Sequence, residues 1–129
     1  MITVYDLSLD FDSNFNFAET STTGKISDDS VAVCFYNSKR VMPQINAIGG
    51  AENSSYGIKA ITVLLRYTND NYQAEQQALK IQNFFNRRKC KINQKNIRYE
   101  LLYQEPIFLG TDDKGVYEYS FEINVYYER

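Results

Sequence analysis

The clearest pattern of apolar and polar positions is a helical one. From about 71 to 88, apolar residues recur at the spacing i, i+4, i+7 and i+11, which is one face of an amphipathic helix. Asp70 stands before this stretch as an N-cap residue, and Gln73 follows three positions later, as in a capping box. The pattern predicts one main helix whose core-facing residues are Ala74, Ala78, Ile81 and Phe85.

Three stretches in the second half of the chain favour β-strands. Residues 58–68 and 116–127 alternate between apolar and polar positions, as strands with one covered face do. Residues 97–109 form a third strand-like stretch, in which Pro106 favours a bend, a bulge or an edge position. Residues 111–115 have the composition of a hairpin turn, so the last two strands are predicted to pair as a hairpin.

The first part of the chain has weaker patterns. A variant capping box at its start predicts a short helix over about 4–11, and a short strand is expected near 15–18. Residues 31–36 are a compact β-branched and aromatic run that predicts a strand. Residues 37–57 hold no period, and loops of this length in small domains tend to be functional or to order on binding.

These elements predict an α+β fold. We expect a single domain, 1–129, because 129 residues is close to the usual size of one domain. Its core would be a mainly antiparallel, twisted sheet of about four to five strands, with the main helix packed on one face; the fold would also contain the short N-terminal helix.

Composition narrows the functional classes. The chain has eleven tyrosines and eight phenylalanines but no histidine, which removes the commonest general base and the commonest transition-metal ligand. The net charge of −2 suggests neither a nucleic-acid coat nor an acidic tail. Two cysteines without CxxC spacing predict reduced thiols, and no stretch approaches a membrane span of roughly 18 apolar residues. We therefore expect a soluble protein with no membrane partner.

The candidate catalytic and metal-binding patterns fail on geometry. Glu118 and Glu122 would lie roughly 13 Å apart on one strand, at about 3.3 Å per residue, which is too far for a glycosidase pair. A calcium-like alternation begins at Asp10, but Phe15 stands where the loop needs glycine. Cys90 follows three basic residues that could lower its pKa, yet no base lies near it in sequence. We expect no enzyme activity, no cofactor and no metal site.

A basic cluster is the one local electrostatic feature of the sequence. Its six cations are Arg87, Arg88, Lys89, Lys91, Lys95 and Arg98, with no acidic residue among them. One interpretation is a patch that contacts phosphates. The other, which we favour, is that the first three cations complement the negative end of the main helix dipole and the rest lie in a solvated connector.

The second half of the chain also resembles a known family. The similarity covers about 31–129 and includes the long strand that begins at Tyr56-Gly57, the helix rich in Glu, Gln and Ala, and the stretch EPIFLGTDDKGVYEYSFEINVYYER. Its most specific part is the hairpin pattern P-x-x-L-G-x-D-x-x-G-x-Y-x-Y over 106–119. On these residues the chain resembles the minor capsid and tail-terminator-like proteins of tailed bacteriophages and prophages.

The resemblance implies a structural virion protein at the tail or the head–tail junction, made in the cytoplasm of a bacterial host. Such proteins assemble into a ring, typically of six subunits, which ends the tail tube and offers a docking surface to the head connector. The expected partners are further copies of the chain, the tail tube protein and the head-completion protein, with DNA passing close by without specific binding. A monomeric adaptor for one protein or nucleic acid stays open as the alternative, and an enzyme is third.

Interface residues can be proposed from apolar and aromatic side chains in the long loop and near strand ends. The candidates are Met42, Pro43, Ile45, Ile48, Tyr56, Phe108, Tyr126 and Tyr127. The basic cluster is the candidate for residues that border a DNA channel.

Overall fold

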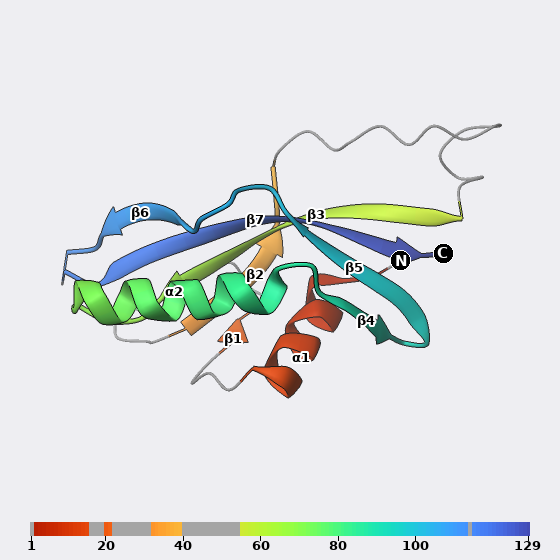
Figure 1. The fold of residues 1–129 in the computed structure, drawn as a ribbon, viewed down its shortest axis with the longest axis horizontal. Coiled ribbons are helices and arrows are strands. Elements are labelled where there is room, and N and C mark those ends of the chain that lie inside the picture. Colours follow the sequence, from red (N-terminus) through yellow and green to blue (C-terminus); the bar gives the residue numbers. More distant parts are fainter. Residues whose placement is uncertain (1, 16–19, 22–31, 40–54, 114) are drawn as a thin grey trace.

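A computed structural model describes residues 2–15, 20–21, 32–39, 55–113 and 115–129 (Figure 1). Its elements in chain order are α1 (Val4–Asn14), β1 (Thr20–Ser21), β2 (Ala32–Asn37), β3 (Tyr56–Arg66), α2 (Asn71–Phe85), β4 (Lys89–Ile92), β5 (Lys95–Leu101), β6 (Ile107–Thr111) and β7 (Tyr117–Glu128). The fold is α+β, as predicted.

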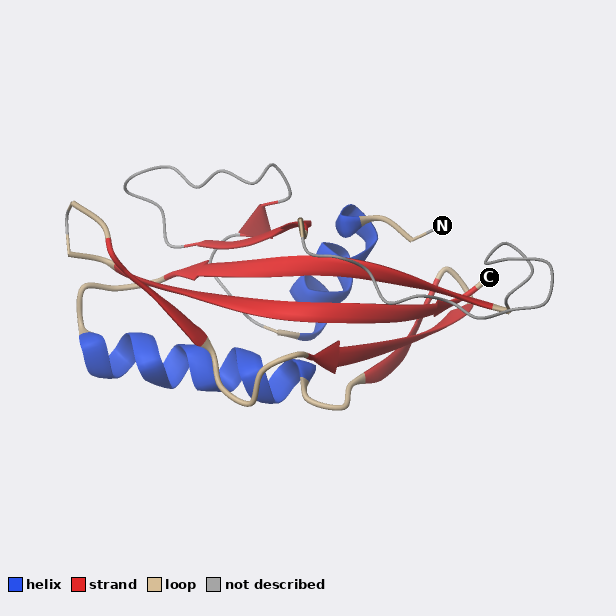
Figure 2. Cartoon of the chain, turned by 90° about the horizontal axis from the view of Figure 1, so that it is seen from above, coloured by secondary structure: helices blue, strands red, loops and turns tan. Residues whose placement is uncertain are grey.

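The described strands form one seven-stranded sheet with the order β1-β2-β3-β7-β5-β4, and β6 also pairs with β7. Every pairing is antiparallel except that of the two-residue β1 with β2. The long strands β3 and β7 pair from Tyr56↔Glu128 to Arg66↔Glu118 and run side by side across the molecule (Figure 2). On the other side of β7, β6 pairs with its first residues and β5 with its last. β7 is therefore the central strand that joins the two ends of the sheet.

Both helices lie on the same side of the sheet and enclose the core (Figure 1). The rings of Phe11 on α1, Phe35 on β2 and Phe85 on α2 meet there, with centroids 5.5 to 6.1 Å apart. The predicted inward residues of β3, Ile61, Val63 and Leu65, are fully buried. The core-facing stripe predicted for the main helix is confirmed, because Ala74, Ala78, Ile81 and Phe85 are fully buried.

Local chemistry fixes the helix starts. The Thr3 side chain accepts a hydrogen bond from the backbone N–H of Asp6, and the Asp6 carboxylate accepts one from the Thr3 N–H, which is the predicted capping box. Asp70 accepts from the N–H of Gln73 at the start of α2. Gly115 adopts φ 79° in the turn between β6 and β7, which confirms its predicted freedom to take positive φ.

Several predicted boundaries differ from the structure. The stretch 97–109 is two strands, because residues 102–106 leave the sheet before β6 begins after Pro106. The polar connector expected after the main helix is the hairpin β4–β5, so the sheet has more strands than the four to five expected. The short strand expected near 15–18 lies mostly outside the described residues, and a strand follows at Thr20–Ser21.

The outer face of β7 was expected to be solvated, and this was wrong in part. Ser120 and Asn124 are buried because β7 is flanked on both sides by paired strands. Glu122 accepts hydrogen bonds from the hydroxyls of Thr62, at 3.0 Å, and Ser38, at 3.2 Å. Small polar residues and a bonded carboxylate therefore fill the middle of this face.

Candidate functional site

A groove at one end of the sheet brings two predicted sets of residues together. It has a volume of about 820 Å³ and lies where β7 ends, between the start of β3 and the hairpin β4–β5. Three predicted interface tyrosines and three members of the basic cluster line it: Tyr56, Tyr126, Tyr127, Lys89, Lys95 and Arg98. We call these six residues the aromatic–basic groove.

The tyrosines of the groove are held by neighbouring strands. Tyr56 and Tyr126 have ring centroids 6.2 Å apart, and the Arg98 guanidinium lies 4.6 Å from the centroid of the Tyr126 ring. The Tyr126 hydroxyl donates to the Glu100 carboxylate at 3.5 Å. Partial burial, followed by the charge of Glu100, raises the pKa of Tyr126, so this hydroxyl stays protonated at neutral pH.

The cations of the groove face each other. Lys89 on β4 lies directly opposite Arg98 on β5, so the two side chains share the outer face of the sheet. Like charges directly opposite each other in a ladder are destabilising. Lys89, Lys95 and Arg98 are exposed, and none has an ion pair with another described residue. The groove therefore carries positive charge that the described fold does not neutralise.

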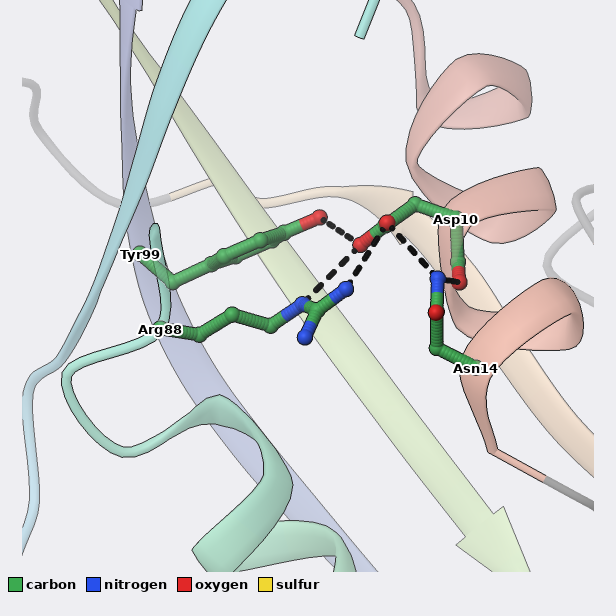
Figure 3. A network of polar contacts seen from close by, with 4 residues as sticks. All are labelled: Asp10, Asn14, Arg88 and Tyr99. Carbon is green, nitrogen blue, oxygen red and sulfur yellow. Dashed lines mark hydrogen bonds and ion pairs between the residues drawn. The ribbon is translucent and has the colours of Figure 1, made fainter. Parts of the chain in front are cut away.

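Arg88 has a different role from the rest of the predicted cluster (Figure 3). Its guanidinium donates to both oxygens of the Asp10 carboxylate, at 2.9 and 3.2 Å, and lies 4.3 Å from the centroid of the Phe84 ring. The buried Tyr99 hydroxyl donates to the same carboxylate at 3.0 Å. Asn14 also contacts Asp10 through its side-chain amide. This network joins α1 to β5 and to the segment after α2.

The helix-dipole interpretation of the cluster was wrong. α2 ends at Phe85, and its last turn has no basic residue. Arg87 follows in a left-handed conformation, φ 55°, and Lys89 already belongs to β4. The chain turns away before the cations begin, so they lie beyond the last helical turn, where the dipole effect falls off.

Arg87 and Lys91 of the cluster do not line the groove itself. Arg87 lines a hollow that adjoins the groove, because Lys89 and Arg98 line both. Lys91 lines a hollow against α1 with Asp6 and Asp10. The structure therefore divides the predicted cluster among the groove, the hollow beside it, the hollow against α1 and the contact of Arg88 with Asp10.

Cys90 lies in the groove but is not an activated thiol. Burial, and next the charge of Asp10, raise its pKa to about 11, and these effects outweigh the opposite influence of Arg88. The expectation that the neighbouring basic residues could lower this pKa was wrong, because desolvation and the nearby carboxylate dominate. The thiol is therefore protonated at neutral pH, which argues against a nucleophilic role.

A second surface lies at the opposite end of the sheet, where α2 begins and β6 runs beside β7 (Figure 1). Large apolar side chains are exposed from this end toward the middle of β7: Tyr72 is 71% and Phe108 53% exposed, and Tyr103, bonded through its carbonyl to Gln82, is 56% exposed. The Phe108 ring packs on Tyr119, at 5.4 Å between centroids. We call Tyr72, Leu79, Tyr103, Phe108 and Leu109 the apolar end.

The sequence analysis assigned only Phe108 of this surface to an interface. Leu79 lies beside the predicted core-facing stripe of the helix and is 38% exposed. Tyr72 and Leu79 lie seven residues apart on the side of α2 that carries Gln82, whose amide donates to the carbonyls of Tyr103 and Gln104. This second stripe on the helix was the signal that could have identified the surface.

Four predicted interface residues, Met42, Pro43, Ile45 and Ile48, lie outside the described residues. Within the described ranges, no group of three or more acidic or cysteine side chains gathers closely enough to hold a metal ion. Neither described helix has the length and apolar character of a membrane span. The described geometry thus offers two surfaces for contact with other molecules.

Comparison with known proteins gives one result. A protein-family model described as bacteriophage tail terminator protein matches residues 19–129. No curated protein and no solved structure matches the chain. The matched range contains β1 to β7 and α2, and with them both the groove and the apolar end. The chain therefore belongs to the bacteriophage tail terminator family and is a structural component of a phage tail.

Proposed function

We propose that the protein assembles into a closed ring that ends the tail tube and joins it to the head connector. The observation that carries the proposal is the presence of two different exposed surfaces at opposite ends of the β3–β7 pair: the aromatic–basic groove and the apolar end. A subunit in a head-to-tail ring needs two unlike surfaces, because each copy contacts its two neighbours differently.

The shape of the subunit supports a mechanical role. β3 and β7 pair over eleven residue positions, and β7 is hydrogen-bonded on both sides, so the two surfaces are joined by a rigid sheet. The Cys90 thiol, with its raised pKa, is protonated at neutral pH, and the Glu122 carboxylate accepts hydrogen bonds from Thr62 within the sheet, so both groups have structural surroundings. A rigid subunit with two contact surfaces fits a geometric function: closing a tube and presenting a face to the next component.

The partners in this proposal are further copies of the chain, with six as the ring number, the tail tube protein and the head-completion protein. DNA would pass through the ring without being held. That the basic cluster borders this channel stays a prediction, and only five of its six cations are candidates because Arg88 is bonded to Asp10.

The test is assembly on tail tubes. The purified protein is measured by light scattering and negative-stain electron microscopy over a range of concentrations, alone and with polymerising tail tube protein. We expect rings, and tubes whose elongation stops when the protein is added. A protein that stays monomeric alone and on tubes, and leaves tube length unchanged, would refute the proposal and favour the monomeric adaptor.

A further inference from the structure

The two ends of the sheet carry opposite charge. Around the apolar end, four exposed carboxylates have no ion pair with another described residue: Asp70, Glu75, Glu105 and Asp113. The cation described nearby, Arg66, is buried and pairs with Asp112. Lys80 lies on a different side of α2 from Glu75, because five residues turn an α-helix by about 140°. The described side chains at this end are therefore acidic as well as apolar.

The acidic side chains adjoin the exposed apolar ones. Glu105 lies in the segment between Tyr103 and Phe108, and Glu75 lies on α2 between Tyr72 and Leu79. Tyr119 packs against the Phe108 ring, and its pKa is raised, first by burial and next by the charge of Glu75. Glu75 is therefore close to the exposed aromatic surface. Apolar surface with charged residues at its border is the usual composition of a protein–protein interface.

The groove has the complementary composition. Its cations Lys89, Lys95 and Arg98 surround tyrosine rings, and Glu128 contributes a carboxylate that already accepts hydrogen bonds from Asn96. The like-charge pair of Lys89 and Arg98 would be relieved by a carboxylate placed between them. The groove is thus suited to an acidic surface with exposed aromatic side chains.

One chain cannot bring these two surfaces together. They lie toward opposite ends of β7: Phe108 pairs with Tyr119 and Arg98 with Tyr126, seven positions or roughly 23 Å apart at about 3.3 Å per residue. Tyr103 lies beside the middle of β7, where the Leu102 N–H donates to the Glu122 carbonyl. We infer that the apolar end of one copy docks in the aromatic–basic groove of the next, with Glu75 and Glu105 opposite Lys95 and Arg98. The inference rests on the proposed ring and identifies which surfaces form its subunit contact. It would place Lys95 and Arg98 in that contact and leave Arg87 and Lys91 as the cluster's candidates for the DNA channel.

The contact is a head-to-tail one between unlike surfaces. It closes a ring when the rotation between neighbours allows it, and each copy then has both surfaces covered. Charges at the border set the orientation of such a contact. They disfavour contact between two acidic ends or between two grooves, because each of these pairings places like charges together. The exposed rings of Tyr103 and Phe108 would supply the apolar area against Tyr56 and Tyr126.

Two charge-reversed variants test the inference. The groove variant carries Lys95→Glu and Arg98→Glu, and the end variant carries Glu75→Lys and Glu105→Lys. Lys80→Glu is the control, since this exposed cation lies on another side of α2. Circular dichroism and urea unfolding at low concentration establish that each variant is folded. Light scattering, electron microscopy and tail-tube capping are then measured as for the natural protein.

We expect each reversed variant alone to associate roughly tenfold more weakly or worse and the control to behave as the natural protein. An equimolar mixture of the two reversed variants should regain association. In the mixture the acidic groove of the groove variant can bind the basic end of the end variant, and the natural basic groove can bind the natural acidic end. If both variants associate as the natural protein does, or if the mixture does not regain association, the inference is overturned. The proposed function stays intact in that case as long as the natural protein forms rings and caps tubes. A natural protein that neither associates nor caps tubes overturns both.

Duplex DNA is the competing ligand for the groove. Binding of a short duplex by the natural protein that is lost in the groove variant, with association unchanged, would assign the cations to DNA and overturn the inference. Weakening of association with rising salt, without measurable DNA binding, is the expected result.

Discussion

The Asp10 network determines how firmly α1 is held to the rest of the molecule (Figure 3). Asp10→Ala removes the carboxylate that accepts hydrogen bonds from Arg88 and Tyr99. The Tyr99 side chain is 2% exposed, so water does not replace the lost acceptor, and an unsatisfied buried hydroxyl costs about 1–3 kcal/mol. The Arg88 side chain is 20% exposed and can be hydrated, which limits the loss of the ion pair to about 1 kcal/mol.

We therefore expect Asp10→Ala to lower the free energy of unfolding by about 2–4 kcal/mol, a large share of the roughly 5–15 kcal/mol of a typical domain. The assay is urea unfolding followed by far-ultraviolet circular dichroism, at concentrations where the protein is monomeric, since assembly would add to the apparent stability. Ser13→Ala on the exposed side of α1 is the matched control, with an expected change within about 0.5 kcal/mol.

The double variant Asp10→Ala, Tyr99→Phe separates the two contributions. Without the Tyr99 hydroxyl no buried donor is left unsatisfied at this position, so the double variant should be more stable than the sum of the two single losses predicts, by about 1 kcal/mol or more. Strictly additive losses, or a loss below about 1 kcal/mol for Asp10→Ala, would refute the reasoning and show that the network contributes little to the attachment of α1.

Three further outcomes follow from single residues. Gly57→Ala places a Cβ 2.4 Å from the ring of Tyr127, so we expect a loss of about 1–3 kcal/mol in thermal unfolding that largely disappears in a Tyr127→Ala background. Gly115→Ala meets no atom within 4 Å but keeps φ 79°, so its loss of about 1 kcal/mol should come from the backbone alone and be smaller for Gly115→Asn. The pKa of Cys90 is raised to about 11, so at pH 8 it should react with a thiol reagent more than about a hundredfold more slowly than free cysteine. The rate of labelling should rise about tenfold per pH unit up to that pKa. Rapid labelling at pH 8 in a Cys34→Ser background would contradict this.

Elements that depend on regular periodicity were predictable from the sequence. The buried stripe of α2 follows from the spacing of Ala74, Ala78, Ile81 and Phe85, and the inward face of β7 follows from the alternation of Phe121, Ile123 and Val125. In both cases one apolar face is buried against the same core, so pattern and structure agree. The turn at Gly115 was predictable because glycine marks positive φ in a sequence.

The errors share a physical cause. The helix ends just before Arg87, and the hairpin β4–β5 turns at Asn93 and Gln94, and all three residues adopt positive φ without being glycine. Helix ends and two-residue hairpin turns usually have glycine at positions of positive φ, and this glycine indicates their location in the sequence. Without that signal the helix was predicted three residues too long and the hairpin was taken for a connector.

The candidate site could be predicted only in part because it depends on register. Tyr56, Tyr126 and Arg98 come from three strands, and they meet because β7 pairs with β3 on one side and β5 on the other. The contact of Arg88 with Asp10 joins residues 78 positions apart, which no local pattern reveals. The second stripe on α2, with Tyr72 and Leu79, was visible in the sequence, but neither residue was predicted to lie at an interface.

The structure separates cations that the sequence presents as one cluster. Arg88 has a carboxylate within the fold, and its removal should destabilise the protein. Lys89 and Arg98 lie opposite each other, and no carboxylate of the described residues forms an ion pair with either, an arrangement that costs stability in the isolated chain. A local cost of this kind is expected where residues serve a partner, because the favourable contact forms only on binding. In the proposed ring that partner is the acidic end of the neighbouring copy, so the same charges that weaken the single subunit would strengthen the assembly and fix its direction.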